Sequence, residues 1–151
     1  MKKTAWLGFW AIAALIPYSP VILATPLTSS PVAVASADTP PAAVKAAITK
    51  LYPTATNVKF DKEEGDYEAS FTYNGKDISV VLDAKGTVKE TETAIATSAL
   101  PAAVRDYVAK HHAGKTIKEA AEIVDAKGKK TYEAEVNGKD LIFDDKGAFI
   151  K

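Results

Sequence analysis

The chain has 151 residues, enough for one domain or two very small ones, and it contains no cysteine. A protein without cysteine has no disulfide framework, no thiolate metal site and no catalytic thiol, so packing alone must hold it together. Its 19 basic and 19 acidic residues balance, which argues against nucleic acid or an anionic membrane as its partner.

The first 37 residues have the pattern of a secretory signal. Lys2 and Lys3 precede an uncharged stretch that lasts until Asp38, as a basic n-region precedes an apolar h-region. Pro17 and Pro20 limit the apolar run to roughly 20 Å of helix, which is shorter than the ~30 Å core of a bilayer. We therefore expect export and no stable membrane insertion of the mature chain.

Small residues predict where this segment is cleaved. Ala35-Ser36-Ala37 is the best cleavage signature, and it predicts a signal peptide of residues 1–37. Cleavage after Ala24 is the alternative. It would leave residues 25–37 as a linker rich in Pro, Ser, Thr and Ala, which cannot bury a core of its own.

An amphipathic helix is expected at the start of the mature chain. Thr39 is a candidate N-cap ahead of Pro40-Pro41, because proline is tolerated in the first helical turn. Tyr52-Pro53 ends the helix, because a residue before proline avoids the helical region. One apolar stripe at helical spacing consists of Val44, Ala47, Ile48 and Leu51.

After this helix the apolar pattern changes to a period of two, which predicts strands. Asn74-Gly75 predicts a hairpin with a type I′ turn, because both central residues of that turn need a positive φ. Asp83 to Gly86 predicts a type I turn, with Asp at its first position and Gly at its last. The expected strands lie at about residues 57–61, 67–73, 78–82 and 87–95.

The same pattern then returns about 60 residues later, as tandem copies of one unit do. Pro-Ala-Ala-Val recurs from Pro101, Asn-Gly-Lys-Asp recurs from Asn137, and the second helix is expected to end at Gly114. Residues 116–125 predict a strand with a bulge near Ala120-Ala121, where the alternation slips. Further strands are expected at about residues 132–136 and 141–143, with a last short one ending at Lys151.

The sequence thus predicts an α+β fold of two tandem repeats, each a helix plus a four-stranded antiparallel sheet, packed as one unit. The first repeat spans residues 38–96 and the second spans residues 97–151, with a joint around residues 93–100. One copy is near the size at which a single core is marginal. We therefore expect the two copies to bury a common core.

His111 and His112 form the only histidine pair. Adjacent helical residues point about 100° apart, and no third ligand lies one turn away, so we expect no metal site. The repeat aligns His111 with Leu51 and His112 with Tyr52. This favours structural roles, with weak metal binding or pH sensing as the alternative.

Acidic residues offer little sign of catalysis or calcium binding. Asp83 and Asp144-Asp145 lack the alternating acid ligands of a calcium loop, and the glycines that follow suit a type I turn. Glu68, Glu133 and Glu135 are expected on the polar side of their strands, where carboxylates keep ordinary pKa values. The sequence therefore predicts no catalytic residue, no metal site and no cofactor.

One face of the sheet remains as a candidate site. If the helices cover one face, the other is left to solvent or to a partner, as antiparallel sheets allow. Its polar residues with an occasional apolar one suit a protein partner and equally suit plain solvent exposure. The residues predicted on it are Glu68, Ser70, Thr72, Ser79, Val81, Glu133, Glu135 and Ile142.

Residues 39–151 contain several short motifs: Pro-Ala-Ala-Val on a helix, Lys118 to Val124, Tyr132 to Glu135, Asn-Gly-Lys-Asp, and Phe143 to Gly147. Together they resemble the PepSY-like family, the group likened to beta-lactamase inhibitor protein. The resemblance implies tandem helix-plus-sheet units, export to the bacterial envelope, and a role in binding or inhibiting other proteins. It implies no catalytic residues.

Our leading hypothesis is an exported, periplasmic or secreted, non-enzymatic binding module, inhibitor-like in kind, whose partner is another envelope protein. The alternative is a periplasmic protein that senses a small ligand or a metal, through His111-His112 or a pocket between the copies. The sequence leaves the partner and the oligomeric state open.

Overall fold

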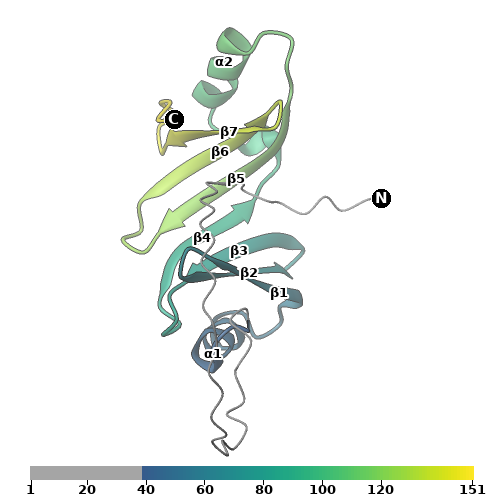
Figure 1. The fold of residues 1–151 in the computed structure, drawn as a ribbon. Helices are drawn as coiled ribbons and strands as arrows, with labels where there is room; N and C mark the ends of the chain where they lie inside the picture. Colours follow the sequence, from purple (N-terminus) through teal and green to yellow (C-terminus); the bar gives the residue numbers. More distant parts are fainter. Residues whose placement is uncertain (1–38) are drawn as a thin grey trace, which may run out of the picture. The chain divides into compact units, whose positions relative to one another are not determined.

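A seven-stranded antiparallel sheet and two α-helices make up the fold of residues 39–151, the part of the chain that the computed structural model describes (Figure 1). The α+β class is as predicted. The predicted signal peptide, with both of its cleavage sites, lies outside these residues. The elements are α1 (Ala42–Leu51), β1 (Thr56–Glu63), β2 (Asp66–Tyr73), β3 (Lys76–Leu82), β4 (Val88–Ala94), the 3₁₀ helix η1 (Thr97–Ala99), α2 (Ala102–His111), β5 (Ile117–Asp125), β6 (Lys130–Val136) and β7 (Lys139–Asp144).

The strands pair in chain order from β1 to β7, each antiparallel to the next. Tight turns set the register of the β2–β3 and β6–β7 hairpins. Asn74 and Gly75 have φ values of 51° and 76°, and Asn137 and Gly138 have 57° and 75°. Both turns therefore have the positive φ angles that a type I′ turn requires, as predicted.

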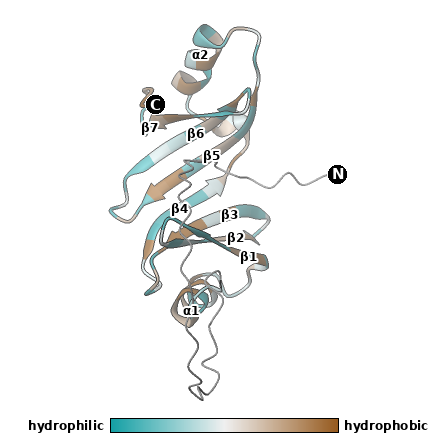
Figure 2. Cartoon of the chain, viewed as in Figure 1, coloured by the Kyte–Doolittle hydropathy of each residue, from teal (hydrophilic) through white to brown (hydrophobic). Residues whose placement is uncertain are grey.

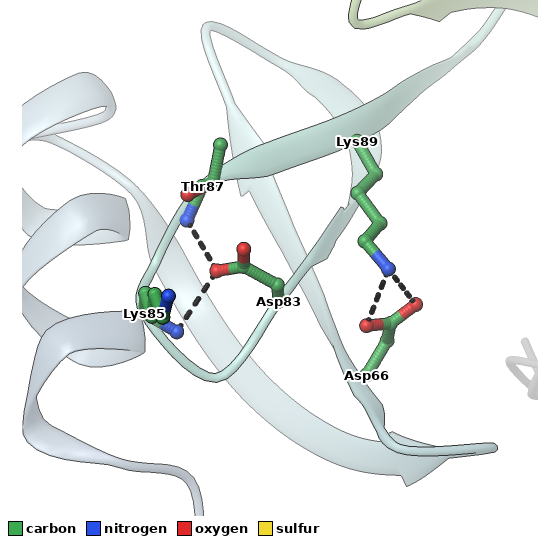
Figure 3. A network of polar contacts seen from close by, with 5 residues as sticks. All are labelled: Asp66, Asp83, Lys85, Thr87 and Lys89. Atoms are coloured by element: carbon green, nitrogen blue, oxygen red, sulfur yellow. Dashed lines mark hydrogen bonds and ion pairs between the residues drawn. The ribbon is translucent and has the colours of Figure 1, made fainter.

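An Asp-x-Lys-Gly turn occurs three times. In the first, Asp83 Oδ1 accepts the backbone N–H groups of Lys85 and Thr87 at 2.8 and 2.9 Å (Figure 3). The Thr87 N–H bond is the largest cause that lowers the pKa of Asp83. Asp125 and Asp144 accept equivalent bonds. These aspartates therefore stabilise turns, which is the interpretation that the sequence favours.

Two apolar clusters, one under each helix, form the core. Val44 and Ile48 of α1 pack in a cluster with residues of β2 and β3. Val104 and Val108 of α2 pack in a second cluster with residues of β5, β6 and β7. Both helices carry hydrophobic and hydrophilic residues, as one-sided packing requires (Figure 2). The expectation of one common core is therefore wrong: each helix has its own cluster, and the sheet runs through both.

The two halves are also unequal in strands. Four strands follow α1, but only β5, β6 and β7 follow α2 in the described residues. The expected last strand is reduced to a bridge between Phe143 and Phe149 and to backbone bonds of Ile142 with Ile150 and Lys151. Phe149 stacks on Tyr107 with ring centroids 4.8 Å apart. Backbone hydrogen bonds and ring stacking thus both hold this segment.

The ends of both helices differ from the sequence predictions. Pro41, and not Thr39, occupies the N-cap position of α1, and its carbonyl accepts the first helical bonds. At the other end, Leu51 is 50% exposed and so leaves the buried stripe. In the second half, α2 ends at His111, ahead of Gly114.

Two bulges occur near the starts of strands. In β5 the register shifts between Ile117 and Glu119, so the predicted bulge at Ala120-Ala121 is misplaced by about one pair. In β1 it shifts between Thr56 and Lys59. Asn57 has a φ of 57°, which breaks the expected alternation.

Candidate functional site

Both helices pack on the same face of the sheet. Paired residues in a sheet point to the same side, and successive residues alternate. Val80, which faces α1, pairs with Thr91, and Thr91 pairs with Val124. Ala120, four residues before Val124 on the same strand, belongs to the cluster under α2. Tracing the register across β4 and β5 thus places the two clusters on one side.

The opposite side is here called the open face. Ser79 connects its two halves, because Ser79 pairs with Glu92 and Glu92 pairs with Ile123. All eight residues that the sequence assigns to one face lie here by register. The open face comprises Glu68, Ser70, Thr72, Ser79, Val81, Glu90, Glu92, Ala121, Ile123, Glu133, Glu135, Asp140 and Ile142.

Three glutamates on alternate strands, Glu68 of β2, Glu92 of β4 and Glu133 of β6, are the centre of this face. The hydroxyl groups of Ser79 and Ser70 donate hydrogen bonds to Glu68 Oε1, the latter at 3.5 Å. Glu68 thus has hydroxyl partners.

Glu133 is 5% exposed, and its Oε1 atom is buried with no hydrogen-bond partner. Its cross-strand neighbours are Ala121 and Ile142, which offer no side-chain donor. Burial, followed by the charges of Glu92 and Asp140 and a hydrogen bond with Asp140, raises the pKa of Glu133 to about 9. The expectation of a solvated carboxylate with an ordinary pKa is wrong here, because a buried carboxyl group disfavours its charged form.

Glu92 is partly buried and titrates in the same way. Burial, followed by the charges of Glu68, Glu90 and Asp140, raises its pKa to about 8. Burial and the charge of Asp125 also raise the pKa of Glu90. At neutral pH the open face therefore keeps protons on two of its central carboxyl groups.

Neither a metal centre nor a catalytic pair emerges from this arrangement. In residues 39–151, no group of three or more His, Cys, Asp or Glu side chains is placed to hold a metal ion. His111 stacks on Tyr107 with ring centroids 4.3 Å apart, and His112 lies 6.4 Å from the same ring. The histidines thus contact an aromatic ring, which fits the structural roles that the repeat favours.

A shallow depression of about 610 Å³ lies in the second half of the chain. Arg105 lines it and donates a hydrogen bond to the Ser98 carbonyl at 3.1 Å, so this guanidinium already has a backbone partner. Lys115 and Ile117 line it as well. Glu92 and Glu133, whose pKa values are raised, do not line this depression.

A family model described as "Putative beta-lactamase-inhibitor-like, PepSY-like" matches residues 29–90 and again residues 73–151. The chain belongs to this PepSY-like family. The two matches together span most of the chain, and each includes one helix of the structure. The resemblance noted in the sequence is confirmed.

Solved structures of Bacteroides proteins are similar to this PepSY-like chain. A DUF2874 family protein from Bacteroides uniformis is 27% identical, with a TM-score of 0.65 over 74% of this chain and 86% of that one. A BLIP-like protein from Bacteroides fragilis is 24% identical, with a TM-score of 0.61 over 76% and 86%. A protein from Bacteroides eggerthii, described as a "putative periplasmic" protein, is 22% identical, with a TM-score of 0.66 over 74% and 86%.

No curated protein matches the chain. Among residues 39–151, neither helix combines the length and apolar character needed to cross a membrane.

Glu92 and Asp140 are members of the open face that the sequence pattern does not predict. The expected strand at residues 87–95 alternates Glu90 and Glu92 with Thr91 and Thr93, so polar residues stand on both sides and the pattern does not tell which side is buried. Asp140 follows the Asn-Gly turn and resembles an ordinary turn residue. The available signal was the alternation of the strand, because Asp140 stands two residues before Ile142, which the sequence assigns to this face.

Proposed function

We propose that this PepSY-like chain is an exported, non-enzymatic protein of the bacterial envelope that binds another protein through the open face of its sheet. The observation that carries the proposal is the division of the sheet into two faces. One face packs on both helices, whereas the other combines the buried carboxyl group of Glu133 with the partly exposed apolar side chains of Val81 and Ile142. A partly apolar surface with a polar surround is typical of protein interfaces.

The similar proteins support the same proposal. The family is described as beta-lactamase-inhibitor-like, and an inhibitor of an enzyme binds a protein. The Bacteroides eggerthii structure is described as periplasmic. For this chain we extend these descriptions to export and to binding, without assigning it an enzyme as target.

Affinity capture tests the proposal. The mature chain is immobilised and exposed to an envelope extract of its source organism. We compare it with Asp140→Lys, which reverses an exposed charge on the open face, and with Asp106→Lys, which makes the same change on exposed α2. We expect the wild type and Asp106→Lys to retain the same protein, and Asp140→Lys to retain several-fold less.

Two results would count against the proposal. In the first, no protein is retained reproducibly by the folded wild-type chain. In the second, the two charge reversals weaken retention equally, which would mean that net charge, and not the open face, governs capture. Circular dichroism of both variants shows whether they fold as the wild type does.

A further inference from the structure

We propose that the partner inserts an arginine side chain between Glu92 and Glu133 of the open face. This inference deepens the proposed function and rests on it. It begins from the unpartnered Glu133 Oε1 atom, which is buried on the open face. A buried acceptor without a donor is costly, so a ligand that supplies a donor gains that free energy.

The two carboxyl groups belong to the two strands on either side of β5. Glu92 of β4 and Glu133 of β6 flank β5, where their cross-strand neighbours are Ile123 and Ala121. The charges of Glu92 and Glu133 act on each other, so the carboxyl groups share one region above β5. The methyl group of Ala121 is small. Ile142, the other cross-strand neighbour of Glu133, is partly exposed and suits the methylene stem of an arginine, whose polar head would meet the carboxyl groups.

The charged groups around this pair are almost all acidic. Asp61 of β1 faces Glu68 of β2, and Glu90 lies on β4 beside Glu92. Asp125 and Glu119 of β5, Glu135 of β6 and Asp140 of β7 add to the set, as do Asp77, which pairs with Thr72, and Asp144, which pairs with Thr131. The cations include Lys59 of β1, which is opposite Ser70, and Lys151, which lowers the pKa of Glu90. Lys89 is a third cation, and its Nζ lies 2.7 Å from Asp66 Oδ2 in an ion pair. An added cation therefore meets a surface of complementary charge.

A guanidinium fits this surface better than a metal ion does. A calcium ion needs six to eight converging oxygen ligands, and no such cluster exists within residues 39–151. A guanidinium has five N–H donors that point in several directions, so it can bridge carboxyl groups that do not converge. It is also weakly hydrated, which lowers the cost of bringing it to a buried carboxyl group.

Proton release follows from the charge states. At neutral pH, Glu92 and Glu133 hold protons because their pKa values are about 8 and about 9. A cation placed between them favours the ionised form and lowers both pKa values. The affinity for arginine should therefore rise as the pH rises from about 6.5 to 8.5, since less work is then needed to remove the proton.

An NMR titration of the isotope-labelled mature chain tests the inference. The probe is acetyl-Ala-Arg-Ala-amide, and its matched control carries citrulline, a neutral isostere, in place of arginine. We expect the arginine peptide to shift amide signals of the open face, with an affinity that rises several-fold from pH 6.5 to 8.5. We expect the citrulline peptide to leave those signals unchanged.

Two protein variants sharpen the result. Glu133→Gln keeps a neutral side chain of the same shape, and we expect it to weaken binding about tenfold and to remove most of its pH dependence. Glu92→Gln is the second variant, which keeps the test valid if Glu133→Gln does not fold. Equal binding of the citrulline peptide, shifts spread over both helices, or the same shifts with calcium chloride or spermidine would overturn the inference.

Competition separates this inference from the proposed function. The arginine peptide is added to the capture experiment at a concentration that saturates the open face. If a partner is retained in an Asp140-dependent way and the peptide does not displace it, the inference is wrong while the proposed function stands. If the peptide binds the open face and no partner is ever retained, the proposed function is wrong.

Discussion

Gly86 lies against the first helix, while Gly128 occupies the same position of an equivalent turn with open space around it. Both glycines have a positive φ, of 82° and 79°. A Cβ atom on Gly86 would lie 2.6 Å from the carbonyl oxygen of Ala43, whereas a Cβ atom on Gly128 would have no heavy atom within 4 Å. Substitutions at these two glycines therefore separate the energetic cost of backbone strain from the cost of a clash with α1.

Gly86→Ala should destabilise the fold more than Gly128→Ala. The positive φ alone costs an alanine about 1–2 kcal/mol, and this applies to both variants. At Gly86 the clash is with backbone, which cannot rotate away, so we expect an additional loss of about 1–3 kcal/mol. The free energy of unfolding in urea measures both changes. An equal loss of unfolding free energy in both variants would show that the close contact of Gly86 with α1 does not contribute to stability.

The raised pKa values of Glu92 and Glu133 predict how stability depends on pH. An unfolded glutamate has a pKa of 4.5, against about 8 and about 9 in the fold. Between these values the unfolded chain releases protons that the folded chain keeps. The contribution of these groups to the free energy of unfolding is therefore fully present below pH 4.5 and is lost as the pH rises to about 8–9.

Thermal unfolding between pH 5 and pH 10 checks this dependence. Asp83 and Asp125 have lowered pKa values, so their contribution to stability is lost as the pH falls. The pH range therefore begins at pH 5, where this opposite effect is small. We expect the melting temperature of the wild type to fall by several degrees toward pH 9. Glu92→Gln and Glu133→Gln should flatten the curve. A wild-type melting temperature that stays level or rises would contradict the raised pKa values.

At the scale of elements, the segment after β7 depends on aromatic contacts. The ring of Tyr107 lies 5.4 Å from that of Phe143 and 4.8 Å from that of Phe149, centroid to centroid. The amide of Ile142 donates to the Lys151 carbonyl at 2.8 Å, and the amide of Ile150 donates back to Ile142 at 2.8 Å. Ile150 and Lys151, the partners of Ile142 in these bonds, directly follow Phe149 in the chain.

Phe149→Ala should therefore loosen this segment without unfolding the sheet. We expect faster amide hydrogen exchange at Ile142 and Ile150, while Glu133, which pairs with Ile142 inside the β6–β7 ladder, keeps its protection. Unchanged exchange at Ile150 would show that backbone pairing alone holds the segment. A general loss of protection would show that Phe149 belongs to the core.

Elements with local signals could be predicted from the sequence. The hairpins follow from Asn-Gly turns, and the helices from apolar spacing and the prolines at their start. The final strand could not be predicted correctly, because the alternation near Phe149 does not show that its ring stacks on Tyr107. The exposure of Leu51 likewise depends on where the helix leaves the sheet, which spacing does not reveal.

At the scale of the molecule, the pairing of β4 with β5 joins the two halves. It brings Glu92 of the first half near Glu133 of the second, with Ala94 paired to Ala121. In the chain, η1 and α2 separate β4 from β5, so no local sequence pattern predicts this contact. The sequence thus predicted eight residues of the open face, but neither Glu92 nor Asp140, nor the raised pKa values of Glu92 and Glu133.

The same pairing explains why a repeated sequence has a site that is not repeated. Each half supplies its own helix and apolar cluster. The pair of Glu92 and Glu133 needs both halves, since each contributes one carboxyl group to the region above β5. We therefore propose that the centre of binding lies at the joint of the halves and not within either copy.

Site-specific photo-crosslinking tests the central claim most directly. A photoreactive side chain replaces Val81 or Ile142 on the open face, and Lys50 or Lys110 at exposed positions of the helices. Each variant is illuminated in an envelope extract of the source organism, and adducts are resolved by mass on a gel. We predict one protein adduct from Val81 and Ile142 and none from Lys50 and Lys110. Adducts from the helix positions, or from no position at all, would contradict the account.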